Sequence, residues 1–165
     1  MSVLIILPLK GFNDYDLLNF LEICNDKAFV ATYDRELAIG KYGSKVVPDF
    51  SFERILRFKS SPFDTLVIIA DEGWKSLDIP EVKIITAGFL VPNKKIIAIS
   101  LAPVLLSKFG FLKGKIATYN YEEFPKYEKI LRTNGVKVTN FPVFKDGNII
   151  TCKGGDSVFI IKKYI

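Results

Sequence analysis

Unbroken runs of aliphatic residues recur along this chain and constrain its fold more than any other feature of the sequence. Segments 3–7, 65–70 and 96–99 are runs of this kind, and 28–33 and 116–119 are further strand candidates. Such a run predicts a strand buried on both faces, because a strand with one solvated face alternates apolar and polar residues. The stretches between the strands show helical periodicity in three places: 14–24, 101–109 and 121–134. Strands that alternate with helices predict an α/β domain with a mainly parallel sheet.

Shorter signals complete this outline. Segments 45–48 and 50–52 read as short edge elements, because Pro48 cannot donate to a strand ladder. Asp146-Gly147 between apolar segments predicts a hairpin. Gly135 should end the helix over 121–134. The tail over 156–165 fits either a strand or a helix.

The length of the chain predicts one domain over residues 1–165, since a single core serves about 100–200 residues. No run reaches the roughly 18 apolar residues of a membrane span. The first apolar run is too short for a signal peptide and lacks a basic flank. With only 2 cysteines, a disulfide framework is not expected. We therefore expect a cytoplasmic protein without a membrane partner.

The chain contains no histidine, which excludes Ser-His and Cys-His catalytic pairs and His-ligated zinc. The net charge of +5 comes from lysines spread along the chain, with no basic block. A solvated lysine-rich surface explains this pattern better than a nucleic-acid partner. The absence of Gln and the scarcity of Met and Cys also suit a thermostable protein, although an AT-rich genome produces a similar bias.

Ser100 is the strongest local candidate for chemistry. It follows the buried run 96–99 and precedes a helical run, and Ala98 and Ala102 flank it at two residues on either side. Small residues in these places are typical of a sharp, strained strand-to-helix turn that presents a nucleophile, where the next N–H faces an oxyanion. The alternative is that Ser100 only caps the helix, with Pro103 in its first turn. No histidine is present to deprotonate the hydroxyl.

Four blocks of this sequence together resemble the ThiJ/PfpI superfamily. Segment 96–118, around Ser100, resembles the family's A-I-C-[HA]-G-P, L-L and G-x-L-x-G-x-x-A-T patterns. Segment 13–17 resembles E-x-x-E-L, and segment 63–69 resembles F-D-x-L-V-I-P. Segment 143–154 resembles V-x-D-G-N-x-x-T-S-R-G. The resemblance covers nearly the whole chain. It implies the class I glutamine amidotransferase-like fold, a flavodoxin-like three-layer sandwich around a mainly parallel sheet.

The resemblance places the family's functional positions on particular residues here. The nucleophilic Cys falls on Ser100, its frequent His neighbour on Leu101, and the acid that bonds the thiol on Asp16. The family's oxyanion glycine is lost from its register at 69–71, and Gly73 replaces it only if the loop has shifted. These departures imply a degenerate nucleophile elbow, because an unassisted serine hydroxyl does not ionise near neutral pH.

The sequence therefore favours a non-catalytic protein that binds a small metabolite or serves in an interaction or a stress response. The alternative is a hydrolase, deglycase or glyoxalase-like enzyme that uses Ser100 with Asp16. We expect no cofactor and no metal. The resemblance implies a homodimer or a larger homo-oligomer. A helix beginning near Leu101, joined by Gly73 if the loop of Gly73 has shifted, predicts a weak site for a small anionic metabolite that Asp16 opposes when ionised.

Weaker candidates surround this site. Asp71 and Glu72, with Asp16, offer oxygen ligands for a hard cation, although solvated loop carboxylates are the more common outcome. Cys152 is placed to bring a thiol near Ser100, but a buried, inert cysteine is more common. Two further residues, Trp74 and Cys24, are expected mainly to pack.

Overall fold

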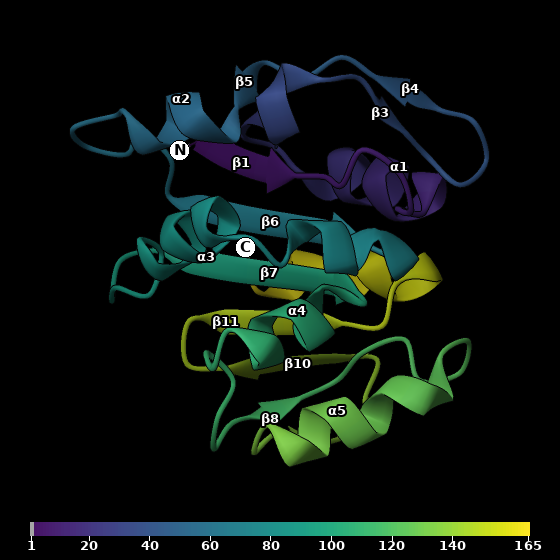
Figure 1. The fold of residues 1–165 in the computed structure, drawn as a ribbon. Helices are drawn as coiled ribbons and strands as arrows, with labels where there is room; N and C mark the ends of the chain where they lie inside the picture. Colours follow the sequence, from purple (N-terminus) through teal and green to yellow (C-terminus); the bar gives the residue numbers. More distant parts are fainter. Residues whose placement is uncertain (1) are drawn as a thin grey trace.

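A seven-stranded sheet runs through the middle of the molecule, with the strand order β10-β11-β7-β6-β1-β2-β5 (Figure 1). We describe residues 2–165 from a computed structural model. The strands are β1 (Ser2–Ile6), β2 (Lys27–Thr32), β5 (Phe50–Ser51), β6 (Thr65–Ala70), β7 (Lys95–Ser100), β10 (Val143–Asp146) and β11 (Ile149–Cys152). Every neighbouring pair is parallel except β10 and β11, which form the predicted hairpin. The prediction of a mainly parallel sheet is confirmed.

Helices cover both faces of this sheet and give the predicted three layers. On one face lie α1 (Asp14–Ile23) and the 3₁₀-helix η4 (Gly155–Lys163), which contact each other. The other face carries α2 (Phe52–Leu56), the 3₁₀-helix η2 (Glu72–Leu77), α3 (Pro80–Ala87), α4 (Ala102–Lys108) and α5 (Glu128–Thr133). The strand order around β1 is that of a flavodoxin-like sheet, in which the chain reverses its direction of travel between β1 and β6.

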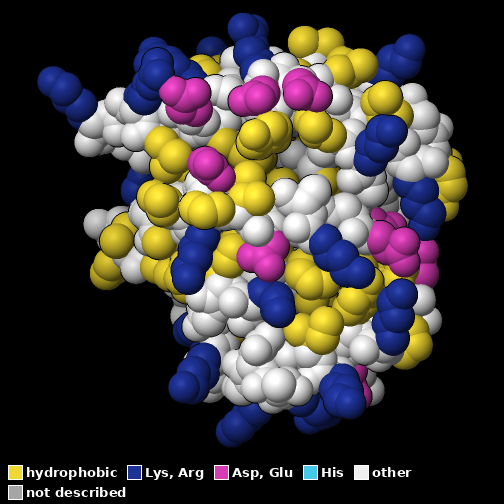
Figure 2. Space-filling model, in the orientation of Figure 1, with side chains coloured by type: hydrophobic (Ala, Val, Ile, Leu, Met, Phe, Trp, Pro, Cys, Tyr) yellow, Lys and Arg dark blue, Asp and Glu magenta, His cyan; other side chains and the backbone are white. Residues whose placement is uncertain are grey.

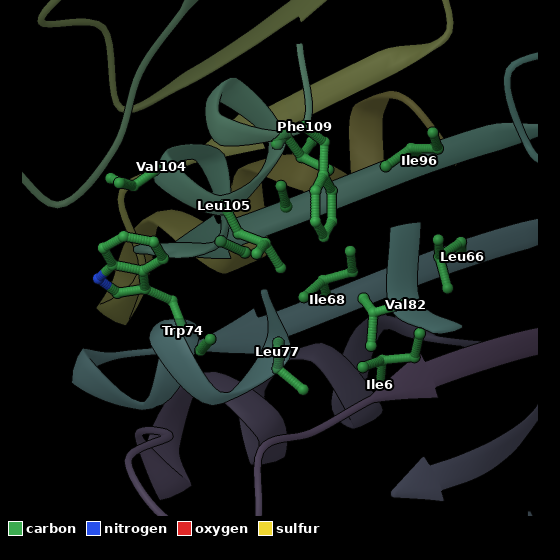
Figure 3. Packing of buried hydrophobic residues seen from close by; sticks show 14 of the residues in the cluster. Ile6, Leu66, Ile68, Trp74, Leu77, Val82, Ile96, Val104, Leu105 and Phe109 are labelled. Carbon is green, nitrogen blue, oxygen red and sulfur yellow. The ribbon is translucent and has the colours of Figure 1, made fainter. Parts of the chain in front are cut away.

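The central strands divide the apolar core into two clusters. On the side of α3 and α4, Ile6, Ile68 and Ile96 pack under Val82 and Leu105 (Figure 3). On the other side, alternate residues of the same strands pack under α1 and η4. Burial on both faces is the reason that the aliphatic runs in the sequence are unbroken.

The structure corrects the predicted helix over 121–134. The α-helix α5 begins only at Glu128, after a short 3₁₀-helix, η3 (Pro125–Tyr127). Pro125 has no N–H and cannot stand in the fifth position of a helix that begins at Tyr121. The preceding loop turns instead, with the Phe124 N–H donating to the Asn120 carbonyl at 3.0 Å. Gly135 ends α5 with a φ of 80°, as predicted.

The smaller elements lie outside the central sheet. The predicted strand over 116–119 is only β8 (Ile116–Ala117), which pairs with β9 (Lys137–Val138) in a separate two-stranded sheet. A second pair is formed by β3 (Ala38–Ile39) and β4 (Lys45–Val46), and the 3₁₀-helix η1 (Tyr33–Arg35) follows β2. The tail, which the sequence left open, is the helix η4. Within residues 2–165, no helix combines the length and the apolar character needed to span a bilayer.

Candidate functional site

Ser100 stands at a strained turn between β7 and α4. It is the last residue of β7, and its φ of 65° lies in the left-handed region that serine rarely adopts. The predicted backbone strain at this position is confirmed. Ala98 and Ala102 are fully buried beside it, and the Asn120 N–H donates to the Ser100 carbonyl at 3.0 Å. Strain of this kind persists only where the surrounding structure holds it, and it is concentrated at functional sites.

The Ser100 hydroxyl is enclosed. The residue is 1% exposed, and its Oγ has no hydrogen-bond partner within residues 2–165. A buried hydroxyl without a partner costs about 1–3 kcal/mol. Ser100 therefore does not cap α4, which is the structural role that the sequence offered as an alternative. Among the described residues, 2–165, no side chain caps that helix.

Hydrogen bonds tie the loops at the carboxyl ends of the strands to one another and to α1. The Asp71 N–H, after β6, donates to the Gly11 carbonyl, after β1, at 2.7 Å. The Gly155 N–H, after β11, donates to Asp16 Oδ1 at 2.7 Å. Parallel strands bring these loops to one edge of the sheet, and that edge is where α/β proteins bind ligands.

Asp16 lies in the first turn of α1 and is 2% exposed. Burial raises its pKa to about 6, the Gly155 hydrogen bond opposes the rise, and the nearby charges of Asp71 and Glu123 add to it. Asp16 is thus a buried acid that titrates just below neutral pH. A carboxyl group with this pKa can take up a proton in the physiological range.

From the sequence, the Leu101 N–H is expected at an oxyanion hole, and the Gly73 N–H there only if its loop has shifted; both N–H groups are engaged elsewhere. The Leu101 N–H donates to the Ala70 carbonyl at 2.8 Å, and the Gly73 N–H donates to the Gly11 carbonyl at 3.1 Å. The Leu101 side chain is fully buried in the core beneath α4 and lines none of the pockets described below. Neither of these two N–H groups is free to bind an anion in this structure, because both hold the loops together.

Gly73 has a packing role instead. A Cβ built on it would lie 2.0 Å from the Lys10 carbonyl oxygen and 2.9 Å from that of Gly11. Glycine is required here because the loops after β1 and β6 cross in direct backbone contact.

An ion-pair cluster that the sequence did not reveal lies beside the turn. Lys41 Nζ is 2.8 Å from Glu123 Oε1 and 3.5 Å from Asp71 Oδ2. The hydrogen bond to Glu123 raises the pKa of Lys41, so the ammonium stays charged. Lys41 lies between β3 and β4 and Glu123 precedes η3, so no local pattern connects the two residues.

These residues line a pocket of about 340 Å³, which we call the acidic pocket. Its lining consists of Gly11, Lys41, Asp71, Glu72, Glu123 and Phe124. The lining carries three carboxylates and one ammonium, and one of the carboxylates, Glu72, has a second ammonium beside it outside the lining, so the pocket disfavours anions. Glu72 lies at its outer edge, exposed and 4.0 Å from Lys126 Nζ.

Asp71 is the most unusual side chain of this pocket. It is 3% exposed, and neither carboxylate oxygen accepts a hydrogen bond within residues 2–165. Burial raises its pKa, and the Lys41 charge opposes the rise. No group of at least three His, Cys, Asp or Glu side chains within residues 2–165 is arranged to hold a metal ion. The hard-cation alternative for Asp71, Glu72 and Asp16 thus gains no support from the geometry.

The remaining candidates pack into the core. Cys152 is fully buried on β11, and burial raises its pKa to about 12, so its thiol stays protonated. Trp74 is buried on η2 and packs edge-to-face against Tyr127, with 5.8 Å between the two ring centroids. Cys24 follows α1 and packs at the margin of the second cluster, where burial raises its pKa.

Comparisons with known proteins agree with the observed fold. Residues 1–165 match the DJ-1/PfpI family. The uncharacterized protein MJ0967 of Methanocaldococcus jannaschii is 29% identical over 162 residues, which cover 94% of this chain and 76% of that protein.

Two solved structures share the fold. A ThiJ/PfpI domain protein from Brachyspira murdochii superposes with a TM-score of 0.85 at 20% identity, over 99% of this chain and 92% of that one. Drosophila melanogaster DJ-1beta superposes with a TM-score of 0.81 at 24% identity, over 98% of this chain and 86% of that one. The match over the full length, on a fold with a strained residue at the end of β7, shows that this chain belongs to the DJ-1/PfpI family.

Proposed function

We propose that this protein is a non-catalytic member of its family and that it binds a small metabolite carrying an amine group in the acidic pocket. One observation carries the proposal. Asp71 lines the pocket as a buried carboxylate whose two oxygens accept no hydrogen bond within residues 2–165. Lys41 offers Asp71 an opposite charge 3.5 Å away but no hydrogen bond of ordinary length, and the ammonium group of a ligand would supply both the donors and the charge.

The rest of the pocket supports this ligand class. Lys41 is the cation nearest to Asp71, but Glu123 holds it at 2.8 Å and leaves it 3.5 Å from Asp71 Oδ2. A ligand ammonium at hydrogen-bond distance would compete with Lys41 for Asp71. Phe124 contributes an apolar wall for the ligand's carbon chain.

Titration calorimetry near pH 7.5 with three compounds of similar length tests this proposal: 1,4-diaminobutane, 1,4-butanediol and succinate. We expect the diamine to bind and succinate not to bind. Asp71→Asn should weaken diamine binding at least about tenfold, because a charge-assisted hydrogen bond is lost. Glu36→Gln, an exposed carboxylate outside the pocket, is the matched control and should leave the affinity unchanged.

Two results would overturn the assignment. One is preferential binding of succinate, particularly if Asp16→Asn strengthens it, since this result would restore the anion site predicted from the sequence. The other is diamine binding that Asp71→Asn leaves unchanged.

The pKa of Asp16 favours a second candidate function, a hydrolase or glyoxalase-like enzyme. In that case Asp16, with a pKa of about 6, would have to move into hydrogen-bond distance of the Ser100 hydroxyl to take its proton, because the Ser100 Oγ has no hydrogen-bond partner within residues 2–165. We rank this function second because the Leu101 and Gly73 N–H groups are engaged in backbone hydrogen bonds and leave no oxyanion hole there.

Activity assays separate the two functions. We expect the purified protein to consume neither methylglyoxal nor p-nitrophenyl acetate above the rate of Ser100→Ala. Peroxide treatment followed by mass spectrometry should give no sulfinic acid at position 100, because serine cannot enter that oxidation series. Turnover that Ser100→Ala abolishes would establish the enzyme instead.

A further inference from the structure

A second pocket, larger than the acidic pocket, opens where the sheet reverses its winding. It has a volume of about 660 Å³ and lies between the loop that follows β1 and the η2 segment that follows β6. We call it the switch-point pocket. In doubly wound sheets, the crevice between the two strands at which the winding reverses is the preferred ligand site. Its volume is within the range of about 300–1,000 Å³ that is typical of small-molecule sites.

Apolar side chains form most of its walls. Leu7 and Leu77 are buried at its base, and Leu9 and Ile79 are half-buried along its sides. Tyr33 adds its ring from η1. Figure 2 shows several groups of apolar side chains on one face of the molecule, with Lys, Arg, Asp and Glu side chains among them. The walls therefore suit an apolar chain or ring.

Two lysines give the pocket a charged rim. Lys10 and Lys75 line it, both are exposed, and neither has an ion-pair partner within residues 2–165. The opposing charge in the lining is Glu72, which has Lys126 Nζ 4.0 Å from its Oε1. The rim is thus suited to a single negative charge.

We propose that the switch-point pocket binds an amphipathic monocarboxylate, with its aliphatic chain against the leucines and its carboxylate between Lys10 and Lys75. This site is separate from the acidic pocket, with which it shares only Glu72. The two pockets also have opposite preferences for ligand charge, so the inference does not depend on the proposed function.

Nuclear magnetic resonance of ¹⁵N-labelled protein tests the proposal with octanoate, hexanoate and octanol as probes. Octanoate should shift the amide signals of Leu9, Tyr33 and Ile79 and leave those of Asp71 and Glu123 in place. Its affinity should exceed that of hexanoate at least about fivefold, because two more methylenes leave water. The double variant Lys10→Gln/Lys75→Gln should weaken octanoate at least about fivefold while changing octanol less than about twofold.

The matched control is Lys59→Gln/Lys83→Gln, which removes the same charge from exposed positions elsewhere and should not affect octanoate binding. The proposal is overturned if octanoate shifts no amides of the pocket, or shifts those of the acidic pocket instead. Equal weakening in the two double variants would also overturn it, because it would show a general effect of net charge. Failure of the diamine to bind near Asp71 would leave these outcomes unchanged, so the two proposals fail separately.

Discussion

Replacing Gly73 with alanine should lower the free energy of unfolding by about 3 kcal/mol or more, the largest single-residue effect that we expect in this protein. The new methyl group would lie 2.0 Å from the Lys10 carbonyl oxygen, and backbone on the opposite side of the contact cannot rotate away. To relieve the overlap, the loops after β1 and β6 would have to separate. That movement would break the hydrogen bonds from Asp71 and Gly73 to the Gly11 carbonyl.

Urea unfolding followed by the fluorescence of Trp74, the only tryptophan, measures this effect. Gly155→Ala is the control. Gly155 has a φ of +62°, but apart from the adjoining backbone no atom of residues 2–165 lies within 4 Å of the position that its new methyl group would take, so it tests backbone strain without a clash. We expect this control to lose only about 1–2 kcal/mol. A Gly73→Ala variant as stable as Gly155→Ala would show that the two loops are not in close contact.

The parts of the fold that local patterns encode were predictable. The unbroken runs of β1, β6 and β7 identify a sheet covered on both faces, and Asp146-Gly147 identifies the hairpin. Small residues around Ser100 identify the strained turn, because a tight turn leaves room only for small side chains at the neighbouring positions.

The prediction missed α3, although Pro80 stands at its start and Val82 and Ile85 are buried along one side. The helix spans only Pro80–Ala87, which is too short for a clear helical period.

The contacts that define the site were not predictable in this way. Lys41 reaches Asp71 and Glu123 across long separations in the sequence, and no local pattern specifies such a cluster. The resemblance to the family left Gly73 as an oxyanion donor only if its loop had shifted, and its N–H donates to the Gly11 carbonyl instead. A glycine that admits a close backbone contact and a glycine that presents an N–H to a ligand are the same letter in a sequence. Only the neighbouring loop distinguishes the two roles.

Replacing Asp16 with asparagine should raise the free energy of unfolding at neutral pH by up to about 3 kcal/mol. The pKa of Asp16 is about 6 in the folded protein, against 3.8 for an unperturbed aspartate, and each unit of difference corresponds to about 1.4 kcal/mol. Because the pKa is raised, the folded state holds the proton more tightly than the unfolded chain does. The free energy of unfolding therefore falls as pH rises from about 4 to about 6, and above that range the protein bears the whole loss of stability that the buried Asp16 charge causes. Asparagine keeps an oxygen for the Gly155 N–H and carries no charge.

Urea unfolding at pH 4.5 and pH 7.5 tests this prediction, with a gain for Asp16→Asn that widens by about 2 kcal/mol between the two conditions. Asp14→Asn, in the same helical turn, is the control. Burial acts to raise the pKa of Asp14 as well, but hydrogen bonds from Ser44 and Tyr42 outweigh burial and lower it. Asp14→Asn should therefore destabilise the protein at neutral pH, the opposite sign. If Asp16→Asn loses stability at pH 7.5 as Asp14→Asn does, the Asp16 carboxylate is stabilised by its surroundings and cannot serve as a proton acceptor near neutral pH.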